Sequence, residues 1–394
     1  MMKQSAFRFV DEHHEEMLNE WQELVQIDSG TLNKAGVDSV GARIRQFLEA
    51  ERATIRTIEF EAVGNLLIGE IGKERPRPGV VLMGHMDTVF KAGTTLERPF
   101  TIRQGNAYGP GALDMKGGIV TILYAIKALN AAGYDTRPIK ILLAGDEENG
   151  HKKSNAANCL IDEAKGHAAA FNCETGYVDN GIVVGRKGMA SITIEVKGVA
   201  AHAGNDPENG RNAIVELATK IVPIQNLTNR ESGVLVNVGV IQGGTVENAV
   251  PDFAKMIVDV RYSELEQIKD ILRKIEEIGA QTYIQGTTTT VSLALGIAPM
   301  KTDDGVMELF SVVKKTYEEN GWGTPYPKTV GGGADSAYSV MAGVPTVCAM
   351  GVKGGRNHSP DEFAVVESLF ERTKLLVGCI LNLDECLSTN QAKS

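Results

Sequence analysis

Clustered basic residues are missing from this sequence of 394 residues, whose formal net charge is −10. Nucleic acids and anionic membranes attract clusters of lysine and arginine, so neither is an expected partner. No window holds the roughly 18 apolar residues of a membrane span. Acidic residues interrupt every apolar stretch near the N-terminus, which argues against a signal peptide. These absences predict a cytoplasmic chain.

Cysteine is also scarce, and no two cysteines form a C-x-x-C pair. The five positions are Cys159, Cys173, Cys348, Cys379 and Cys386. An odd, scattered set indicates reduced, mostly buried thiols and excludes a disulfide framework or a zinc knuckle. The glycine-rich stretches lack the G-x-G-x-x-G pattern that follows a first strand in nicotinamide- and nucleotide-binding proteins, so that class is not expected either.

The chain instead contains helical and strand-like segments in alternation. Apolar residues at helical spacing predict helices over 10–25 and 37–51. Strand-like runs follow, and between 117 and 174 helices alternate with continuous apolar strands. This pattern is typical of an α/β domain with a mostly parallel sheet covered by helices on both faces.

The pattern changes near Arg186 and resumes near 300. Between 187 and 299 the predicted order is β-α-β-β-α-β, which is the order of a ferredoxin-like α+β domain. A helix over 305–321, a strand over 345–351 and a last helix over 364–381 then complete the α/β pattern. We therefore predict a discontinuous domain, 1–186 and 300–394, that is interrupted by an inserted domain, 187–299.

Acids and histidines follow four of the predicted parallel strands. "VVLMG" leads to His85 and Asp87, "IKILLAG" to Asp146, Glu147 and Glu148, "AAAFNC" to Glu174, and "PTVCAMG" through a glycine-rich loop to His358. The turn "YGPGALDMKGG" places Asp114 just before a helix. Ligands of open α/β sheets bind outside the carboxyl ends of the strands, so these side chains should converge in one crevice.

Two histidines and several carboxylates in one crevice need a cation, because the carboxylates would otherwise repel one another. Imidazole and carboxylate without cysteine suit Zn²⁺ or a similar divalent ion. Two ions about 3.5 Å apart with a shared carboxylate would use the whole set. His85 alone would more often be structural, and an acidic turn alone would more often be solvated. Because all four clusters follow strands of the same polarity, the metal site is the favoured interpretation.

Five motifs in this order resemble one family closely: "GHMDTV", "GPGALDMKGG", "GDEENG", "NCETG" and "NHSPDEF". It is the co-catalytic zinc hydrolase family that contains aminoacylase, acetylornithine deacetylase, succinyl-diaminopimelate desuccinylase and bacterial glutamate carboxypeptidase. The resemblance covers nearly the whole chain, and the overall layout is most similar to the glutamate carboxypeptidase branch. It implies two divalent metal ions, Zn²⁺ in the first place with Co²⁺ or Mn²⁺ as alternatives.

The resemblance also implies a role for each motif residue. Asp114 would bridge the two metal ions. His85 and Glu174 would complete one site, and Glu148 and His358 would complete the other. Glu147 would be the general base. Asp87 would hydrogen-bond the far nitrogen of His85 and fix its tautomer. The peptide bond between Asp114 and Met115 would be cis.

Further implied residues contact the substrate. The inserted domain would act as a lid and as a dimerisation surface, and His202 would be an oxyanion donor. Asn248 and Arg261 would hold the free carboxylate of the substrate, which a guanidinium can bind bidentately. Gly332 and Gly333, in the loop around Asp335, would line the substrate pocket, and Arg356 would contact a carboxylate. Without the resemblance, His202 would be an ordinary loop histidine and Arg261 a solvated strand end.

The expected reaction is hydrolysis of an amide bond by metal-activated water, with release of a C-terminal amino acid from a peptidyl or N-acyl group. Glutamate is the candidate amino acid. An N-acyl-amino-acid deacylase and a dipeptidase would use the same residues, so both alternatives stay open. A non-catalytic binding protein of the same fold is the alternative from another class, and the presence of all five ligands and the base argues against it. The expected partners are a small peptide or N-acyl amino acid and a second copy of the chain.

Overall fold

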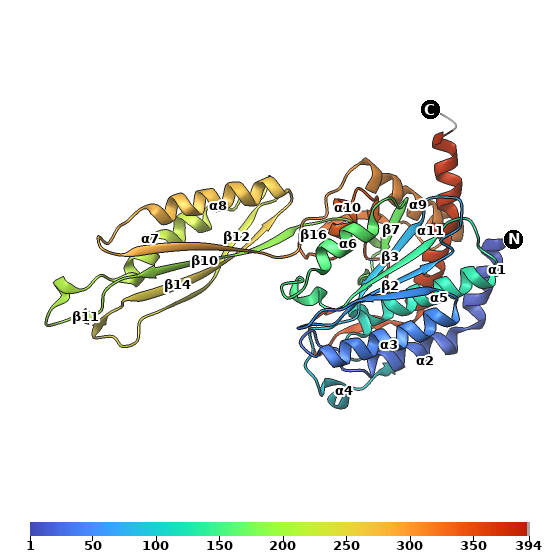
Figure 1. Cartoon of the computed structure of the whole chain (residues 1–394), viewed down its shortest axis with the longest axis horizontal. Helices are drawn as coiled ribbons and strands as arrows, with labels where there is room; N and C mark the ends of the chain where they lie inside the picture. Colours follow the sequence, from blue (N-terminus) through green and yellow to red (C-terminus); the bar gives the residue numbers. More distant parts are fainter. Residues whose placement is uncertain (392–394) are drawn as a thin grey trace. The chain divides into compact units, whose positions relative to one another are not determined.

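The chain folds into two compact units (Figure 1). The structure is a computed structural model that describes residues 1–391, with side chains described for 1–383. One unit contains Met1–Gly185, Thr302–Thr329 and the described residues from Ala334 onward, and the other contains Arg186–Lys301 and Val330–Gly333. The division thus lies within two residues of the expected boundaries, and it adds the short segment 330–333 to the insert.

A six-stranded sheet forms the centre of the first unit, in the order β1-β2-β6-β3-β7-β17. Its parallel strands are β6 (Ile139–Ala144), β3 (Val80–His85), β7 (Ala169–Asn172) and β17 (Thr346–Val347). β2 (Leu66–Ile71) runs antiparallel to β6 and to β1 (Thr54–Ile58). Every residue of β3 and β7 is buried, which explains their continuous apolar sequence. The mostly parallel sheet is confirmed.

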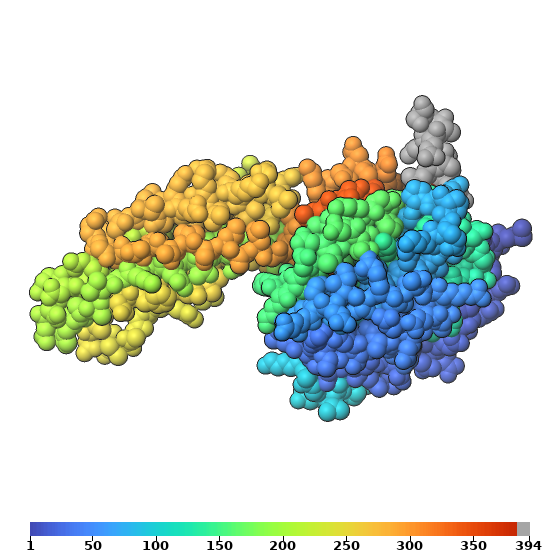
Figure 2. All heavy atoms as spheres, viewed as in Figure 1, coloured from blue at the N-terminus to red at the C-terminus, as the bar shows by residue number. Residues whose placement is uncertain are grey.

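Helices sandwich this sheet. α5 (Gly117–Ala131) packs on β3 and contacts α1 (Met2–Glu12), α2 (His14–Val25), α3 (Lys34–Ala50) and α11 (Val366–Gln391). α6 (Ala156–Ala164) packs on β6, α10 (Ser336–Met341) on β7, and α9 (Asp304–Asn320) on β17. The N-terminal helices, in blue, form much of the surface of this unit in Figure 2. Among the described residues, no helix is both long and apolar enough to span a membrane.

Two expected elements differ from the prediction. The single helix expected over 10–25 is instead the pair α1 and α2, which meet at His13, where φ is −120°. Val10 and Met17 are buried on either side of the break, so the apolar spacing continued through it. The strand expected over 345–351 contains only the two residues of β17. The four cysteines with described side chains are thiols, as expected, and Cys386 lies outside those residues.

Short strands that the sequence patterns did not predict build a second sheet, in the order β4-β5-β19-β18-β8. They are β4 (Thr101–Arg103), β5 (Asn106–Tyr108), β8 (Gly176–Tyr177), β18 (Lys353–Gly355) and β19 (Phe363–Val365). Three of them contact the turn η1 (Ala112–Lys116), which carries Asp114. β18 pairs in parallel with β8, which places the loop after Gly355 beside the segment that follows β7. The first unit also contains α4 (Thr94–Glu97) and all but the last residue of each strand in the pair β9 (Gly181–Arg186) and β16 (Tyr326–Val330).

The second unit is a four-stranded antiparallel sheet with two helices packed on it, in the order β12-β14-β10-β15. Its elements are β10 (Gly188–Lys197), α7 (Ala213–Gln225), β12 (Leu235–Gly243), β14 (Phe253–Tyr262), α8 (Leu265–Ala280) and β15 (Thr288–Leu295). Alternate residues of β10 and β14 are buried in one core with apolar residues of the two helices. A small two-stranded antiparallel sheet, β11 (Ala201–His202) with β13 (Ala249–Val250), is added to this plan. The ferredoxin-like order is confirmed.

A buried ion pair on α7 contacts the segment that follows α8. Nζ of Lys220 lies 2.7 Å from Oε1 of Glu216, and both residues on α7 are almost completely buried. Oε2 of Glu216 accepts hydrogen bonds from the backbone nitrogens of Tyr283 (2.8 Å) and Ile284 (2.6 Å). Lys220 also donates to the carbonyl oxygen of Gln281 (2.6 Å). The loss of either charge would leave the other one buried without its counterion.

We expect Glu216→Ala to lower the free energy of unfolding by about 3 kcal/mol or more, because Lys220 and two backbone N–H groups lose their partner. Urea denaturation together with hydrogen exchange of the amides of Tyr283 and Ile284 measures this loss. The control is Glu266→Ala, which removes an exposed glutamate paired with Lys269 and should cost less than about 1 kcal/mol. Equal, small effects of both substitutions would contradict the importance of the buried pair.

Candidate metal centre

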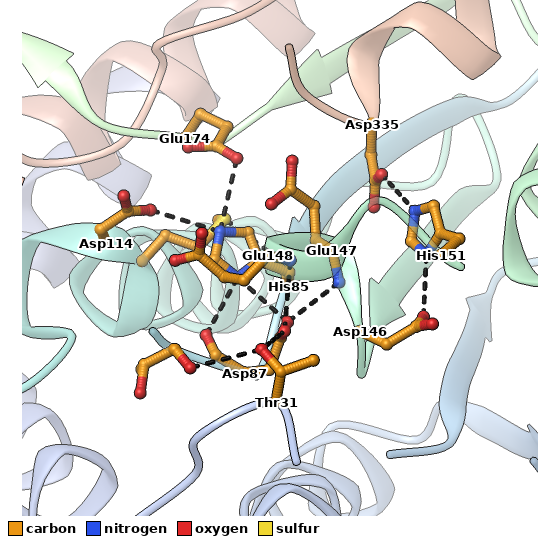
Figure 3. A network of polar contacts seen from close by, with 12 residues as sticks. Thr31, His85, Asp87, Asp114, Asp146, Glu147, Glu148, His151, Glu174 and Asp335 are labelled. Carbon is orange, nitrogen blue, oxygen red and sulfur yellow. Dashed lines mark hydrogen bonds and ion pairs between the residues drawn. The ribbon is translucent and has the colours of Figure 1, made fainter. Parts of the chain in front are cut away.

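The carboxyl ends of β3, β6 and β7 place several acids and a histidine side by side. His85 is the last residue of β3 and pairs in register with Ala144, the last residue of β6. Glu147 and Glu148 follow in the short turn η2 (Glu147–Asn149), and Glu174 follows β7. Figure 3 shows the side chains of His85, Glu147, Glu148 and Glu174 gathered together with Asp114.

Two groups of three possible ligand atoms meet at Asp114. In the first group, Nε2 of His85 lies 3.3 Å from Oδ1 of Asp114 and 3.4 Å from Oε1 of Glu174. In the second, Nε2 of His358 lies 3.2 Å from Oδ2 of Asp114 and 3.3 Å from Oε2 of Glu148. The structure therefore brings together the five residues expected as ligands, with each oxygen of Asp114 facing a different histidine.

The spacing and chemistry of these atoms fit two divalent metal ions. Ligand atoms about 2.0 Å from a tetrahedral zinc ion stand about 3.3 Å apart, close to the separations seen here. Nε2 of His85 and Oε1 of Glu148 are buried, and among the described residues neither has a hydrogen-bond partner. Nitrogen and carboxylate donors without sulfur suit zinc and similar ions.

Asp87 contacts both the turn η2 and His85. Its carboxylate is completely buried, and it accepts hydrogen bonds from the backbone nitrogens of Glu147 (3.1 Å) and Glu148 (3.2 Å) and from Oγ1 of Thr31 (2.6 Å). Nδ1 of His85 lies 3.0 Å from the carbonyl oxygen of Asp87 and 3.4 Å from its carboxylate. Nδ1 of His85 thus faces the backbone oxygen of Asp87 most closely and its carboxylate at a slightly longer distance, and the expected role of this carboxylate in fixing the tautomer stays a prediction.

The turn that carries Asp114 is irregular. Asp114 and Met115 have non-helical dihedral angles inside η1, and the peptide bond between them is cis, as predicted. At Gly118, in the first turn of α5, an added Cβ would lie 1.9 Å from the carbonyl oxygen of Cys173. Only glycine therefore permits this close approach between α5 and the end of β7.

The loop between β18 and β19 positions His358. The φ angle of His358 is +62°, which is uncommon for a residue other than glycine and frequent at functional sites. Nδ2 of Asn357 donates a hydrogen bond to Oδ2 of Asp114 (3.0 Å). At the other end of the loop, the buried carboxylate of Glu362 accepts a hydrogen bond from the backbone nitrogen of Leu113 (3.1 Å). We assigned no role to Asn357 or Glu362 from the sequence, although both lie in "NHSPDEF".

His151 is a further residue that the sequence did not single out. It is buried, and its Nδ1 lies 2.7 Å from Oδ1 of Asp146 while its Nε2 lies 2.7 Å from Oδ1 of Asp335. Burial opposes a charge on this imidazole, but the two carboxylates outweigh burial and raise its pKa well above the ordinary value. An imidazolium thus links the segment around Glu147 to the start of α10 (Figure 3).

Burial and neighbouring charges shift the pKa values of the centre. Burial raises the pKa of Glu147 well above its usual range, and burial raises the pKa of Glu148 to about 7. Hydrogen bonds to Asp114 and Glu148 raise the pKa of His358 to about 11. Burial opposes a charge on His85, but the surrounding carboxylates outweigh it and raise its pKa well above the usual range. Without metal, these shifts favour the protonated form of both histidines.

The remaining expected site residues make their contacts elsewhere. His202, in β11, is exposed, and its Nδ1 accepts hydrogen bonds from the backbone nitrogens of Gly204 (3.1 Å) and Asn205 (3.2 Å). Arg261 binds Asp259 (2.9 Å). The other insert residues also make their contacts within the second unit. The backbone nitrogen of Ala203 donates a hydrogen bond to the carbonyl oxygen of Asn248. The guanidinium of Arg186 donates to the carbonyl oxygens of Gly332 and Gly333.

Arg356 belongs to the first unit and is mostly exposed. Its guanidinium lies 3.5 Å from the carboxylate of Asp361 in the same loop. The structure thus collects the expected metal ligands, Asp87 and Glu147 in one cluster, and the substrate contacts expected of Arg356 and of the insert residues stay predictions.

Known proteins are similar to this chain over most of its length. The family model "Peptidase family M20/M25/M40" matches residues 81–382. Carboxypeptidase G2 from Pseudomonas sp. (strain RS-16) is 30% identical over 370 residues, which cover 92% of this chain and 88% of that protein.

Two solved structures share the fold. Aminopeptidase PepT from Bacillus cereus has a TM-score of 0.80 at 24% identity, over 94% of this chain and 99% of that one. A dinuclear metal-binding M20 peptidase from Bacillus subtilis has a TM-score of 0.69 at 17% identity, over 94% and 98% of the two chains.

We expect metal binding to release protons and to strengthen as the pH rises. His85 and His358 must each lose a proton before they can bind a metal ion, and their raised pKa values keep them protonated near pH 7. Calorimetric titration of the metal-stripped protein with Zn²⁺, in buffers of different ionisation enthalpy, counts the protons. Each histidine should release one proton, and affinity should fall as the pH is lowered. Binding without proton release would contradict the assignment of these histidines as ligands.

We expect Asp87→Asn to weaken metal binding by about 10- to 100-fold, because an amide cannot accept all the hydrogen bonds that orient η2 and Thr31. Competition with a chelator measures the affinity. Asp135→Asn, at an exposed position, is the control and should leave the affinity unchanged. If both variants bind metal as the natural protein does, Asp87 does not support the centre.

Proposed function

The chain belongs to peptidase family M20/M25/M40, and we propose that it is a two-zinc carboxypeptidase. The family makes it a hydrolase. The proposed reaction is hydrolysis of the amide bond that joins a C-terminal amino acid, glutamate as the first candidate, to a peptidyl or N-acyl group. The observation that carries the proposal is the pair of ligand groups that share Asp114, with Glu147 beside them.

The chain's own residues supply the acid–base chemistry, and they orient the base and the proposed metal ligands. His85, Asp114 and Glu174 would hold one ion, and Asp114, Glu148 and His358 the other. Bound zinc lowers the pKa of water to about 7 and polarises the scissile carbonyl group. Glu147 takes the proton of the attacking water on its carboxylate and then gives it to the nitrogen of the leaving amine. Asp87 keeps Glu147 and Glu148 in place through their backbone N–H groups.

The raised pKa of Glu147 supports its role as a proton carrier. A carboxylate with an ordinary pKa would be a weaker base and would take the proton from water less readily. Burial is the main cause of the shift, and the charge of Glu174 adds to it. Glu147 is therefore suited to accept a proton and to return it within one reaction cycle.

Residues of the insert and of nearby loops would recognise the substrate. Asn248 and Arg261 would bind the carboxylate of the leaving amino acid, and His202 would stabilise the oxyanion. Gly332 and Gly333 would line the pocket, and Arg356 would contact an acidic side chain. Support for this carboxypeptidase assignment comes from Carboxypeptidase G2, which covers 92% of the chain. A cytoplasmic location and a homodimer formed through the insert also stay predictions.

We expect the natural protein, when loaded with zinc, to release glutamate from N-acyl and peptidyl glutamate. The test is a matched panel of derivatives of Glu, Asp, Leu, Ala, Lys and ornithine, with release of the free amine as the measurement. Metal-stripped protein is the control. Cleavage governed by the acyl half alone would favour an N-acyl-amino-acid deacylase, and cleavage confined to dipeptides would favour a dipeptidase. No cleavage at all would favour a non-catalytic binding protein.

We expect Glu147→Gln to lower kcat by about 10²- to 10⁴-fold, because the amide cannot carry the proton. Since Glu147 is not among the proposed ligands, both metal ions should stay bound, which elemental analysis checks. Glu97→Gln, at an exposed position of α4, should keep the natural rate. A fully active Glu147→Gln variant would remove this residue from the mechanism.

A further inference from the structure

A cavity of about 510 Å³ lies next to Glu148 in the first unit. Two loops form its walls, residues 30–33 and residues 88–92. The apolar side chains that line it belong to Leu32, Val89, Phe90 and Ala92, and we call this cavity the Leu32 pocket. Its size falls within the range of about 300–1,000 Å³ that is usual for small-molecule sites.

Backbone hydrogen bonds hold the two walls together. The backbone nitrogen of Thr31 donates a hydrogen bond to the carbonyl oxygen of Thr88 (3.0 Å). The backbone nitrogen of Thr88 donates one to the carbonyl oxygen of Ser29 (2.8 Å). At Gly30 an added Cβ would lie 2.1 Å from the carbonyl oxygen of Phe90, so the two walls are in direct backbone contact. A pocket with walls fixed in this way is formed before any ligand arrives, which lowers the entropic cost of binding.

The far end of the second wall is anchored as well. The carboxylate of Asp28 accepts hydrogen bonds from the backbone nitrogens of Gly93 (2.7 Å) and Thr95 (3.1 Å). The segment that carries Val89 and Phe90 is therefore attached at both ends.

Two large apolar side chains of the pocket are exposed to water. Leu32 has 74% of its surface exposed and Val89 has 41%. A bound apolar group would remove this surface from water, and that removal is the main source of hydrophobic binding energy. Exposed leucine alone is common at protein surfaces, but here it borders a preformed cavity beside the metal centre.

The Leu32 pocket is connected to the reacting groups through shared partners. Thr31 of the first wall donates its hydroxyl hydrogen bond to Asp87, and Asp87 also accepts from the backbone nitrogen of Glu148. Glu148 lines the pocket and also belongs to the second ligand group. A group bound in the pocket is thus adjacent to the place where the scissile carbonyl would be held.

We propose that the Leu32 pocket binds an apolar acyl chain, the part of the substrate on the carbonyl side of the scissile bond. This inference rests on the proposed function. Asn248 and Arg261 are proposed for the carboxylate of the leaving amino acid, so the acyl half requires another binding surface. The Leu32 pocket is a preformed, largely apolar surface beside the proposed metal ligand Glu148. Lys91 also lines it, so an anionic acyl group is the competing ligand to be tested.

The test compares four acyl groups on the amino acid that the zinc-loaded protein releases fastest: acetyl, hexanoyl, benzoyl and succinyl. In the natural protein, kcat/KM should rise by about tenfold or more from acetyl to hexanoyl. Leu32→Asp should remove most of this gain, so that the hexanoyl and acetyl compounds are hydrolysed with similar kcat/KM. Because Leu32 is largely exposed, its replacement should not disturb the fold.

Leu96→Asp is the matched control, since Leu96 is 87% exposed in α4 and does not line the pocket. Leu96→Asp should leave kcat/KM for all four acyl compounds unchanged. Lys91→Gln tests the anionic alternative. A preference for the succinyl compound that disappears in Lys91→Gln would overturn the proposal, as would an equal loss for all acyl groups in Leu32→Asp.

A binding measurement separates failure of this inference from failure of the proposed function. Calorimetric titration of the zinc-loaded protein with hexanoate and acetate needs no turnover, and hexanoate should bind about tenfold more tightly. That difference should disappear in Leu32→Asp. Hydrolysis that does not depend on the acyl chain, or equal binding of the two acids, would overturn the inference about the Leu32 pocket and leave the proposed function standing. If no compound is hydrolysed but hexanoate binds selectively, the pocket stands as an apolar binding site and the proposed reaction fails.

Discussion

Both oxygens of the buried Asp114 face a histidine, and this arrangement constrains everything around it. A buried carboxylate needs positive charge or hydrogen-bond donors beside it. Here Oδ1 faces His85 and Oδ2 faces His358, two residues that are far apart in the sequence. The glutamates that flank these histidines add negative charge, so the cluster as a whole attracts cations. Metal ions bound at the two groups would satisfy the same requirement that the protonated histidines satisfy in the free protein.

Much of this arrangement could be predicted from the sequence, because strand polarity alone determines where strand ends meet. Parallel strands end at one edge of a sheet, so His85, Glu148 and Glu174 had to lie close together once β3, β6 and β7 were recognised. The insert could be predicted for a similar reason, since its apolar residues alternate along β10 and β14. Periodicity over whole segments was the signal in each case.

Other features left no such signal. β8 and β18 contain two and three residues, too few for a periodic pattern, yet their pairing brings the loop of His358 to the site. The contact between His151 and Asp335 joins residues 184 positions apart, and nothing in a single sequence marks that pair. The break at His13 was missed because the buried positions keep their helical spacing across it. Tertiary pairing rather than local preference decides all three.

Asp87 explains how the same few residues can serve the chemistry and the binding of the substrate. Its two oxygens are shared between the backbone of η2, which carries Glu147 and Glu148, and the hydroxyl group of Thr31. Thr31 belongs to a wall of the Leu32 pocket. A carboxylate that is completely buried has no water to replace a lost partner, so each of these hydrogen bonds restrains the position of the others. The proposed base, a proposed metal ligand and the pocket wall are therefore held as one rigid group, and a substrate seated in the pocket would meet reacting groups whose positions are already set.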